Sequence, residues 1–451
     1  MRDDRRTPVA DALIDFVLGL DLRTLPGAVT EAAALCLTDW IGAAIRGSTE
    51  PLAAALDAVV GASGGEPQAT IIGRGRRTSA LLAALANGAQ GHALDFDDTH
   101  LASIVHGSAP VAPAALAVAE WRGRSGAAVL EAFVAGFEVE TRIGRVIGPV
   151  LADRGFHVTA VLGHFGAVAA AGRLLGLTAE PMGRALGIAG TQAAGLEQSL
   201  GTMSKPLHPG KAAMNGILAA LLAREGFTGP TGILDARPGL PGTLVGVTDL
   251  SPALADLGTR FEILDNSTKL YAACHLLHAT IDAGRAIRER AAPAAEAIAE
   301  VECHVPPLAV KVAAIPAPRT GLEAKFSAAY CAALALSRGD AAESDFAAPD
   351  PSLLALAGRI RPVADPALRI PEARMRVHLR DGRVLDEAVT AARGTPGRPV
   401  SRHDVEEKFR RLSGVVLPAA QVDRLLEHLG RLPTLPDVES LLRLTFKGER
   451  P

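Results

Sequence analysis

The 451-residue chain has few aromatic residues and no excess of charge of either sign. It contains two Trp, two Tyr and twelve Phe, and its 46 Lys and Arg are balanced by 49 Asp and Glu. Binding of nucleic acid depends on a cationic surface and, for single strands, on aromatic side chains that stack on the bases. We therefore do not expect nucleic acid as a partner.

Cysteine is also scarce, with four residues at positions 36, 274, 303 and 331. None of them forms a C-x-x-C pair, and their spacing matches no zinc or iron–sulfur motif. The simplest interpretation is four free thiols in a reducing compartment. These counts argue against a structural metal site and against an iron–sulfur cluster.

Long hydrophobic segments are missing as well. No run of 18 apolar residues occurs, so the sequence predicts no transmembrane helix. The first residues, MRDDRRTPVADAL, are charged and lack the apolar region of a secretory signal. We expect a cytoplasmic protein without a membrane partner.

What the chain has in abundance is Ala- and Leu-rich sequence with helical periodicity. Gly, Pro, Ser or Thr bound each segment, as is typical of helix ends. The predicted helices in the first part of the chain span residues 26–46, 79–94, 109–123, 125–147, 158–175 and 208–225. The main strand signal there is ATIIG at 69–73.

The pattern changes after residue 266. Helices are predicted at 275–291 and 321–338, a strand at 298–305, and a hairpin around Asp381-Gly382 within residues 374–390. From Ser401 onward the pattern is helical again, with Asp404 placed for a capping box. The sequence thus predicts a mainly α protein, in which residues 1–266 and 398–451 form a large all-helical domain around an inserted α+β domain of residues 267–397.

Eight of the twelve His lie between residues 92 and 278, in four polar islands. Buried carboxylates need partners, and His is the side chain best suited to proton transfer near neutral pH. Helix capping by Asp and a metal site are the alternatives for the first island. That island, residues 91–110, contains His92, Asp95, Asp97, Asp98, Thr99, His100 and His106.

The second and third islands flank predicted helices. His157 precedes a helix, and His164 lies two turns along it, where a core role is the simpler interpretation. Lys205, His208 and Lys211 stand at the start of another helix, whose N-terminus favours an anion. This third island suits a carboxylate ligand, although a solvated Lys pair would give the same pattern.

The fourth island, residues 265–282, adds polar groups from the second part of the chain. The chain has only one tyrosine outside it, Tyr330 in KFSAAY. Either tyrosine hydroxyl would suit a ligand, or would reach the surface from a packed ring. The candidate residues of the island are Lys269, Tyr271, Cys274, His275 and His278.

Together these side chains suit proton transfer next to a carboxylate whose charge is held by Lys. Two other classes of protein compete with this interpretation. The D-x-D-D pattern at 95–98 matches class II terpene cyclases, but those enzymes use aromatic-lined cavities that this chain cannot supply. A helical protein that binds carboxylates without catalysis is the second.

Five segments, in order along the chain, resemble the MmgE/PrpD family. They read ANGAQGHALDFDDTH, HGSAPVAPAALAVAE, GFHVTAVLGHFGAVAAAGRLLGL, GTMSKPLHPGKAAMNGILAALLA and KLYAACHLLHATIDA. The family includes 2-methylcitrate dehydratases, cis-aconitate decarboxylases and an iminodisuccinate epimerase. The resemblance implies a large helical domain with a smaller α+β lid, a homodimer, and no metal or organic cofactor.

The resemblance also implies site residues. Cys274 stands where a decarboxylase-like His is expected, with His275 or His278 available to compensate, and HGS, GFHVT and KLYAAC replace the common HPS, GFHPT and K-P-Y-P. We add Tyr271, His208 and His278 from the islands themselves as substrate-binding candidates. The family positions carried over are Asp95, Thr99, His106, His157, Lys205, Lys269, Cys274, His275 and Tyr330.

The expected function is therefore that of a cofactor-independent lyase. It would act on a small di- or tricarboxylate through a carbanion or enediolate next to a carboxylate. Activity like that of 2-methylcitrate dehydratase is the first expectation. Activity like that of cis-aconitate decarboxylase or iminodisuccinate epimerase is the alternative.

Overall fold

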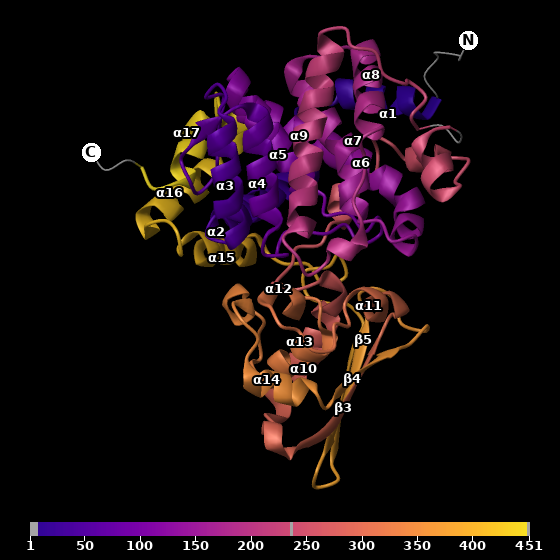
Figure 1. Ribbon diagram of the computed structural model, residues 1–451, viewed down its shortest axis with the longest axis vertical. Coiled ribbons are helices and arrows are strands. Elements are labelled where there is room, and N and C mark those ends of the chain that lie inside the picture. The colour runs from indigo at the N-terminus through magenta and orange to yellow at the C-terminus, as the bar shows by residue number, and fades with distance from the viewer. Residues whose placement is uncertain (1–7, 235–237, 449–451) are drawn as a thin grey trace.

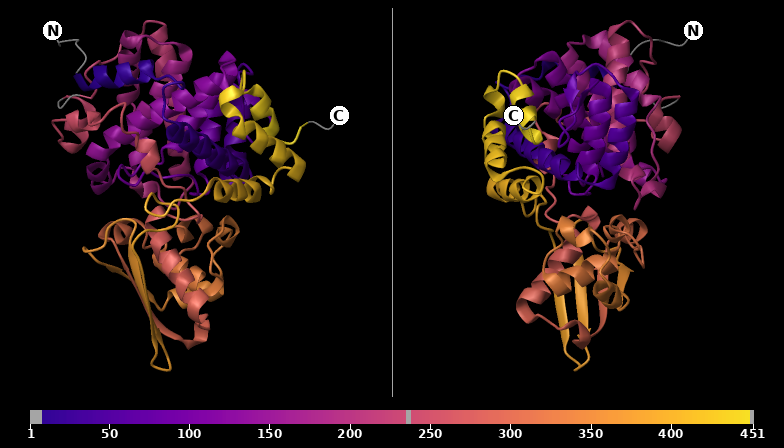
Figure 2. Two further views of the ribbon diagram at one scale, coloured as in Figure 1. Left: turned by 180° about the vertical axis from the view of Figure 1, so that it is seen from behind. Right: turned by 60° about the vertical axis from the view of Figure 1, so that its left-hand side comes forward.

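The chain folds into a large helical lobe and a smaller lobe of helices and strands (Figure 1). The computed structural model describes residues 8–234 and 238–448. Segments from both ends of the chain share the large lobe: helices near the C-terminus lie against the helix Gly27–Gly47 (Figure 2). The prediction of a mainly α protein is confirmed.

The large lobe is built almost entirely of helices, and one apolar core with members from Ala10 to Leu442 connects all of them except the helix Pro51–Ser63, which packs through two smaller apolar clusters. Its only strands among the described residues are the short pair β1 (Ala69–Thr70) and β2 (Arg77–Thr78), so the strand signal at 69–73 is realised over two residues. The helices are α1 (Pro8–Gly19), α2 (Gly27–Gly47), α3 (Pro51–Ser63), α4 (Ala80–His92), α5 (Ser108–Arg122), α6 (Gly126–Asp153), α7 (Val158–Leu175), α8 (Ala179–Gly190), α9 (Ser204–Arg224), α15 (Arg402–Ser413), α16 (Ala419–Gly430) and α17 (Glu439–Leu442).

The small lobe places helices against one four-stranded sheet, whose strand order is β4-β3-β5-β6. Strand β3 pairs in parallel with β4 and antiparallel with β5, and β5 and β6 form a hairpin across Asp381-Gly382. The elements are α10 (His278–Ala291), β3 (Ile298–Val305), α11 (Pro307–Val312), α12 (Gly321–Ala324), α13 (Ala328–Arg338), α14 (Pro351–Ala357), β4 (Ile360–Ala364), β5 (Ala373–Leu379) and β6 (Val384–Val389).

Local signals place most of these elements where the sequence predicts them. The Ser401 hydroxyl accepts from the Asp404 N–H, and the Asp404 carboxylate accepts from the Ser401 N–H, which completes the predicted capping box. The helix predicted at 321–338 is divided in two, because the Ser327 side chain caps α13. The helices α1, α3, α8, α11 and α14 and the strands β2 and β4 were not predicted from the sequence.

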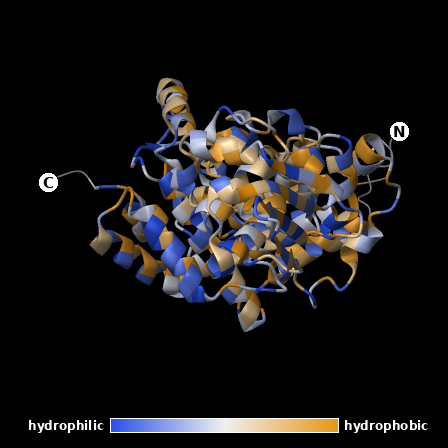
Figure 3. Ribbon diagram, turned by 90° about the horizontal axis from the view of Figure 1, so that it is seen from below, coloured by the Kyte–Doolittle hydropathy of each residue, from blue (hydrophilic) through white to orange (hydrophobic). Residues whose placement is uncertain are grey.

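Two helices, α2 and α7, are long and apolar enough to cross a membrane by length and composition. Within the fold, 72% of the apolar window of α2 and 89% of that of α7 are buried. Polar and apolar residues alternate along most of the ribbons seen from the small-lobe end (Figure 3). Both helices are thus accounted for as core helices of the large lobe.

Small residues allow helices of the large lobe to approach closely. Helix α4 packs on α9 where Gly88 faces Gly210. A Cβ atom added to Gly88 would lie 2.6 Å from the Cα and 2.9 Å from the N of Gly210, and backbone atoms cannot move aside as a side chain can. This contact sets the position of α9, whose first turn carries Lys205.

We predict that Gly88→Ala lowers the free energy of unfolding by about 1–3 kcal/mol, because overpacking forces two helix backbones apart. Chemical denaturation measures this change. The matched control is Gly430→Ala, at the end of α16, where an added Cβ meets nothing within 4 Å. Equal stabilities of the two variants would contradict the tight contact between α4 and α9.

Candidate active site

A cavity of about 710 Å³, counted with its opening to solvent, lies between the two lobes. The large lobe contributes residues from the loops around Asp95 and Phe156 and from the start of α9. The small-lobe side comes from residues 269–276, α11, Phe326 and Ile370. Eight of the twelve predicted site residues line this cavity: Asp95, Thr99, His106, His157, Lys205, Lys269, Cys274 and His275.

Asp95 lies in a short segment that belongs to both lobes. Its backbone adopts a positive φ of 51°, which is uncommon for a residue other than Gly but more readily tolerated by Asp. The neighbouring side chains of Leu94 and Phe96 are buried in the core of the small lobe, although the segment follows α4 of the large lobe. The left-handed turn thus anchors two apolar side chains in one lobe and leaves the Asp95 carboxylate at the cavity.

Two ammonium groups hold the Asp95 carboxylate. Its Oδ1 lies 2.5 Å from Nζ of Lys205 and 3.2 Å from Nζ of Lys269. Burial by itself would raise the pKa of Asp95, but the charges of Lys205 and Lys269 outweigh it and hold the pKa well below its usual range. The carboxylate is therefore ionised, and the pair of lysines keeps one net positive charge beside the cavity.

Three lysines also donate to three consecutive carbonyl groups of this segment. Lys325 Nζ lies 2.5 Å from the Leu94 oxygen, Lys269 Nζ 2.9 Å from the Asp95 oxygen and Lys408 Nζ 2.7 Å from the Phe96 oxygen. These lysines come from the small lobe, the connection between the lobes and α15. The backbone on both sides of Asp95 is therefore fixed by charge-assisted hydrogen bonds from distant parts of the chain.

The three lysines differ in how their charge is balanced. Lys408 forms a second buried ion pair, 2.6 Å from Asp39. Lys325 pairs with no carboxylate among the described residues, and its ammonium lies 5.1 Å from the centre of the Phe346 ring. Burial lowers the pKa of Lys325 to about 8.

Close to Asp95, two histidines share the Asp97 carboxylate. His92 Nδ1 lies 2.7 Å and His106 Nδ1 3.4 Å from Asp97 Oδ2. His106 Nδ1 also lies 2.9 Å from the Asp98 carbonyl oxygen, which only accepts hydrogen bonds. The proton of a neutral His106 therefore resides on Nδ1, and Nε2 keeps its lone pair.

Burial sets the protonation of these rings. It lowers the pKa of His106 to about 3, and the Asp97 carboxylate only partly offsets this effect. Burial also lowers the pKa of His157 well below its usual range, and the nearby charge of Lys205 lowers it further. Both histidines are neutral near pH 7, as a group that accepts a proton must be.

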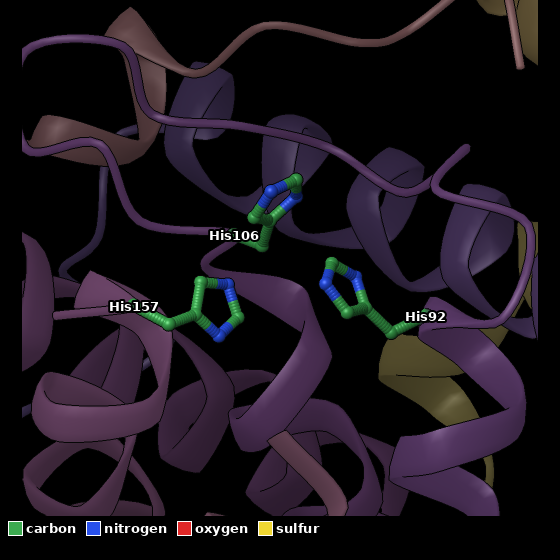
Figure 4. Close-up of side chains that lie close together, drawn as sticks. All are labelled: His92, His106 and His157. Atoms are coloured by element: carbon green, nitrogen blue, oxygen red, sulfur yellow. The ribbon is translucent and has the colours of Figure 1, made fainter. Parts of the chain in front are cut away.

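His157 stands at the start of α7, and its Nδ1 lies 3.0 Å from Nδ1 of His208. Its Nε2 is buried and finds no hydrogen-bond partner among the described residues. Figure 4 shows the rings of His92 and His157 turned toward each other, with the His106 ring above them. Sequence places these rings far apart, and the close packing of α4, α5 and α7 brings them together.

These three rings could also hold a metal ion, because each offers a ligand atom within 4.8 Å of the others. A second candidate group combines His92 and His106 with the carboxylates of Asp95 and Asp97. Lys205 disfavours a positive charge on all three rings, whereas Asp97 favours it on His92 and His106. A metal ion therefore stays the alternative that the sequence raises for the first island.

Four predicted residues do not line the cavity. The Tyr330 hydroxyl accepts from the Asp350 N–H at 3.0 Å inside the small lobe, so it does not occupy the position expected of a catalytic group. The Tyr271 hydroxyl donates to Asp282 at 2.6 Å, and His278 packs against the Tyr271 ring. Of the four, His208 contacts the cavity residue His157, and the His278 ring lies 4.4 Å from the ring of the cavity residue His275.

Several residues of this region were not predicted from the sequence. Lys408 and Lys325 carry no motif that separates them from ordinary helix-surface lysines, yet both are buried beside Asp95. Glu197 lines the cavity on its large-lobe side and had no signal in the sequence.

His275, which was predicted, lies in the lining, and neither of its ring nitrogens has a hydrogen-bond partner among the described residues.

Similarity to known proteins identifies this protein as a lyase. The chain belongs to the MmgE/PrpD family: the N-terminal domain of that family matches residues 11–253 and the C-terminal domain matches residues 271–430. The resemblance stated from the motifs is thereby confirmed.

Relatives with assigned names extend over nearly the whole chain. A cis-aconitate decarboxylase of Aspergillus terreus is 28% identical over 97% of this chain and 96% of its own length. The cis-aconitate decarboxylase of Homo sapiens is 28% identical over 98% of this chain and 95% of its own. The cis-aconitate decarboxylase of Mus musculus is 30% identical over 81% of this chain and 78% of its own length.

We predict that Asp95→Asn destabilises the protein more than Lys269→Met does. The first variant leaves two buried ammonium groups without a counter-charge, which costs about 3–5 kcal/mol when a buried pair is broken. The second leaves the neutral pair of Asp95 and Lys205. Denaturation in urea compares the two, and a Lys269→Met variant that is as unstable as Asp95→Asn would contradict the charge balance described above.

Proposed function

We propose that this protein is a cofactor-independent decarboxylase of a small, unsaturated di- or tricarboxylate. The observation that carries the proposal is the cluster of Lys205, Asp95 and Lys269 beside His106 and His157 in the cavity between the lobes. The names of the relatives favour loss of CO₂ over the dehydration that we expected first from the sequence. Activity like that of 2-methylcitrate dehydratase becomes the alternative.

The chemistry follows from what each group can do. Lys205 and Lys269, with the first turn of α9, would hold a substrate carboxylate and its developing negative charge. The bond to the leaving carboxylate breaks, CO₂ departs, and the electron pair moves through the adjacent double bond to the carbon next to the remaining carboxylate. That carbon then takes a proton, and solvent restores the proton to the donor.

His106 or His157 is the proposed proton carrier. Both are neutral in the free protein, but a bound polycarboxylate adds negative charge beside them and raises their pKa. The substrate thus brings the histidine into the protonated state that the reaction consumes. Thr99, 3.4 Å from His106 Nδ1, and Asp97 would orient the ring.

The small lobe would act as a lid over this chemistry. Lys311 on α11 donates to the carbonyl groups of Ala152 and Asp153 at the end of α6, at 3.1 and 3.2 Å. These hydrogen bonds hold α11 of the small lobe against the large lobe at the rim of the cavity. A homodimer is the assembly that we propose from the family resemblance, and the cytoplasm is the location that we propose from the composition of the chain.

The direct test is incubation in D₂O with cis-aconitate, 2-methylcitrate and iminodisuccinate, followed by NMR. Release of CO₂ with deuterium on the carbon that takes the proton supports the proposal. Loss of water supports the dehydratase alternative, and exchange without net change points to an epimerase. Absence of all three would overturn the proposal for these substrates.

We predict that His106→Gln lowers kcat/KM by about 10²–10⁴-fold, the usual contribution of a positioned acid–base group. The fold should persist, which circular dichroism checks. His403→Gln is the matched control, because His403 is an exposed residue of α15. A His106→Gln variant as active as the control would remove His106 from the mechanism.

We also predict that His106 does not titrate between pH 5 and 8 in the free protein. Its folded-state pKa is about 3, so the neutral ring persists until the pH falls well below 5. The Cε1–H resonance missing from His106→Gln identifies it in an NMR titration. A midpoint near the ordinary value of about 6.5 would contradict the burial-driven shift.

A further inference from the structure

Apolar side chains form much of the cavity wall on the small-lobe side. The small lobe supplies Leu276, Leu308, Val312, Phe326 and Ile370 to the lining, and more than half of all lining residues are apolar. Leu308 and Val312 lie four residues apart on α11 and therefore share one face of that helix. This surface provides no group that holds a carboxylate.

The lining contains as many acidic side chains as lysines. Lys205 and Lys269 are its only lysines among the described residues, and no arginine of the described ranges joins them. Asp95 and Glu197 supply two carboxylates against these two ammonium groups. Burial raises the pKa of Glu197, as expected for an acidic side chain with little compensating charge nearby.

With this balance of charges, the cavity cannot provide a cationic partner for each of the three carboxylates of a tricarboxylate. One or two of them can reach the lysines, the α9 N-terminus and His106. A third would face the apolar side chains, Glu197 or the neutral ring of His275, and an ionised carboxylate buried without a counter-charge is strongly disfavoured. An alkyl group in that place would instead be stabilised by its burial against apolar side chains.

We propose that the preferred substrate carries an alkyl group where cis-aconitate carries its third carboxylate. cis-Aconitate is a glutaconate with a carboxyl group on C3, so the proposed class is the 3-alkylglutaconates. This inference rests on the proposed decarboxylation. The leaving carboxylate, the double bond and the carboxylate that accepts the electron pair are the same in both compounds, and the bond changes are those given above.

Binding of compounds that cannot react tests the inference separately from turnover. The probes are 3-propylglutarate and tricarballylate, the saturated counterparts of the alkyl and carboxyl compounds, measured by isothermal titration with the full chain. We expect 3-propylglutarate to bind at least tenfold more tightly. Equal affinities, tighter binding of tricarballylate, or no binding of either compound would overturn the inference.

A charge placed in the wall should invert the preference. Val312→Lys puts an ammonium group on the partly buried face of α11, and we expect tricarballylate to gain at least tenfold in affinity relative to 3-propylglutarate. Leu308→Lys repeats the test in case the first variant does not fold. Val384→Lys, exposed in the β5–β6 hairpin, is the control and should keep the preference of the natural chain. An unchanged ratio in a folded wall variant would overturn the assignment of this surface.

Turnover then separates the two proposals. We expect release of CO₂ from 3-propylglutaconate with a kcat/KM at least tenfold above that for cis-aconitate. Faster reaction of cis-aconitate would overturn the inference and leave the decarboxylase proposal intact. If no glutaconate reacts although 3-propylglutarate binds tightly, the decarboxylase proposal fails, and the binding preference of the wall stands on its own.

Discussion

The site depends on one constraint, the placement of Asp95 in a left-handed turn whose flanking carbonyl groups each receive a lysine ammonium. Leu94 and Phe96 fill the core of the small lobe, so their side chains cannot move without opening it. The carboxylate between them neutralises part of the charge of Lys205 and Lys269. Packing and electrostatics therefore fix the same three residues, Leu94, Asp95 and Phe96. Their position determines where the Asp95 carboxylate meets the cavity.

This arrangement also controls the protonation of the histidines. Positive charge held near the cavity keeps nearby rings neutral, and burial acts in the same direction. A bound polyanion would oppose both effects, because its negative charge favours the protonated form of a nearby ring. Catalytic competence would then arise only after the substrate has bound, which limits proton exchange in the empty cavity.

Local sequence signals predicted much of the fold. The strand at Ile298–Val305 and the hairpin across Asp381-Gly382 follow from alternation and turn chemistry, and α7 coincides with its predicted range. Short helices such as α11 and α14 have too few turns to show a period. The boundaries drawn at residues 266 and 398 stay a prediction, and the C-terminal domain of the family extends to residue 430, into α16.

Residues of the site were predictable where a motif groups them, and unpredictable where tertiary contact decides. Asp95, Thr99 and His106 share one island, and all three line the cavity. Tyr271 and Tyr330 are polar residues in suggestive sequence, but their hydroxyl groups are taken by Asp282 and the Asp350 N–H. Nothing local reveals such partners, or that Lys408 lies buried against Asp39.

The shared segment around Asp95 has a consequence for how the molecule can be divided. A small lobe excised at its own chain boundaries would lack Leu94 and Phe96 and would expose the apolar surface that they cover. The large lobe alone would keep these side chains without a core to receive them. The two lobes are therefore separate in shape but form a single cooperative unit, and recombination between relatives would have to exchange this segment together with the small lobe.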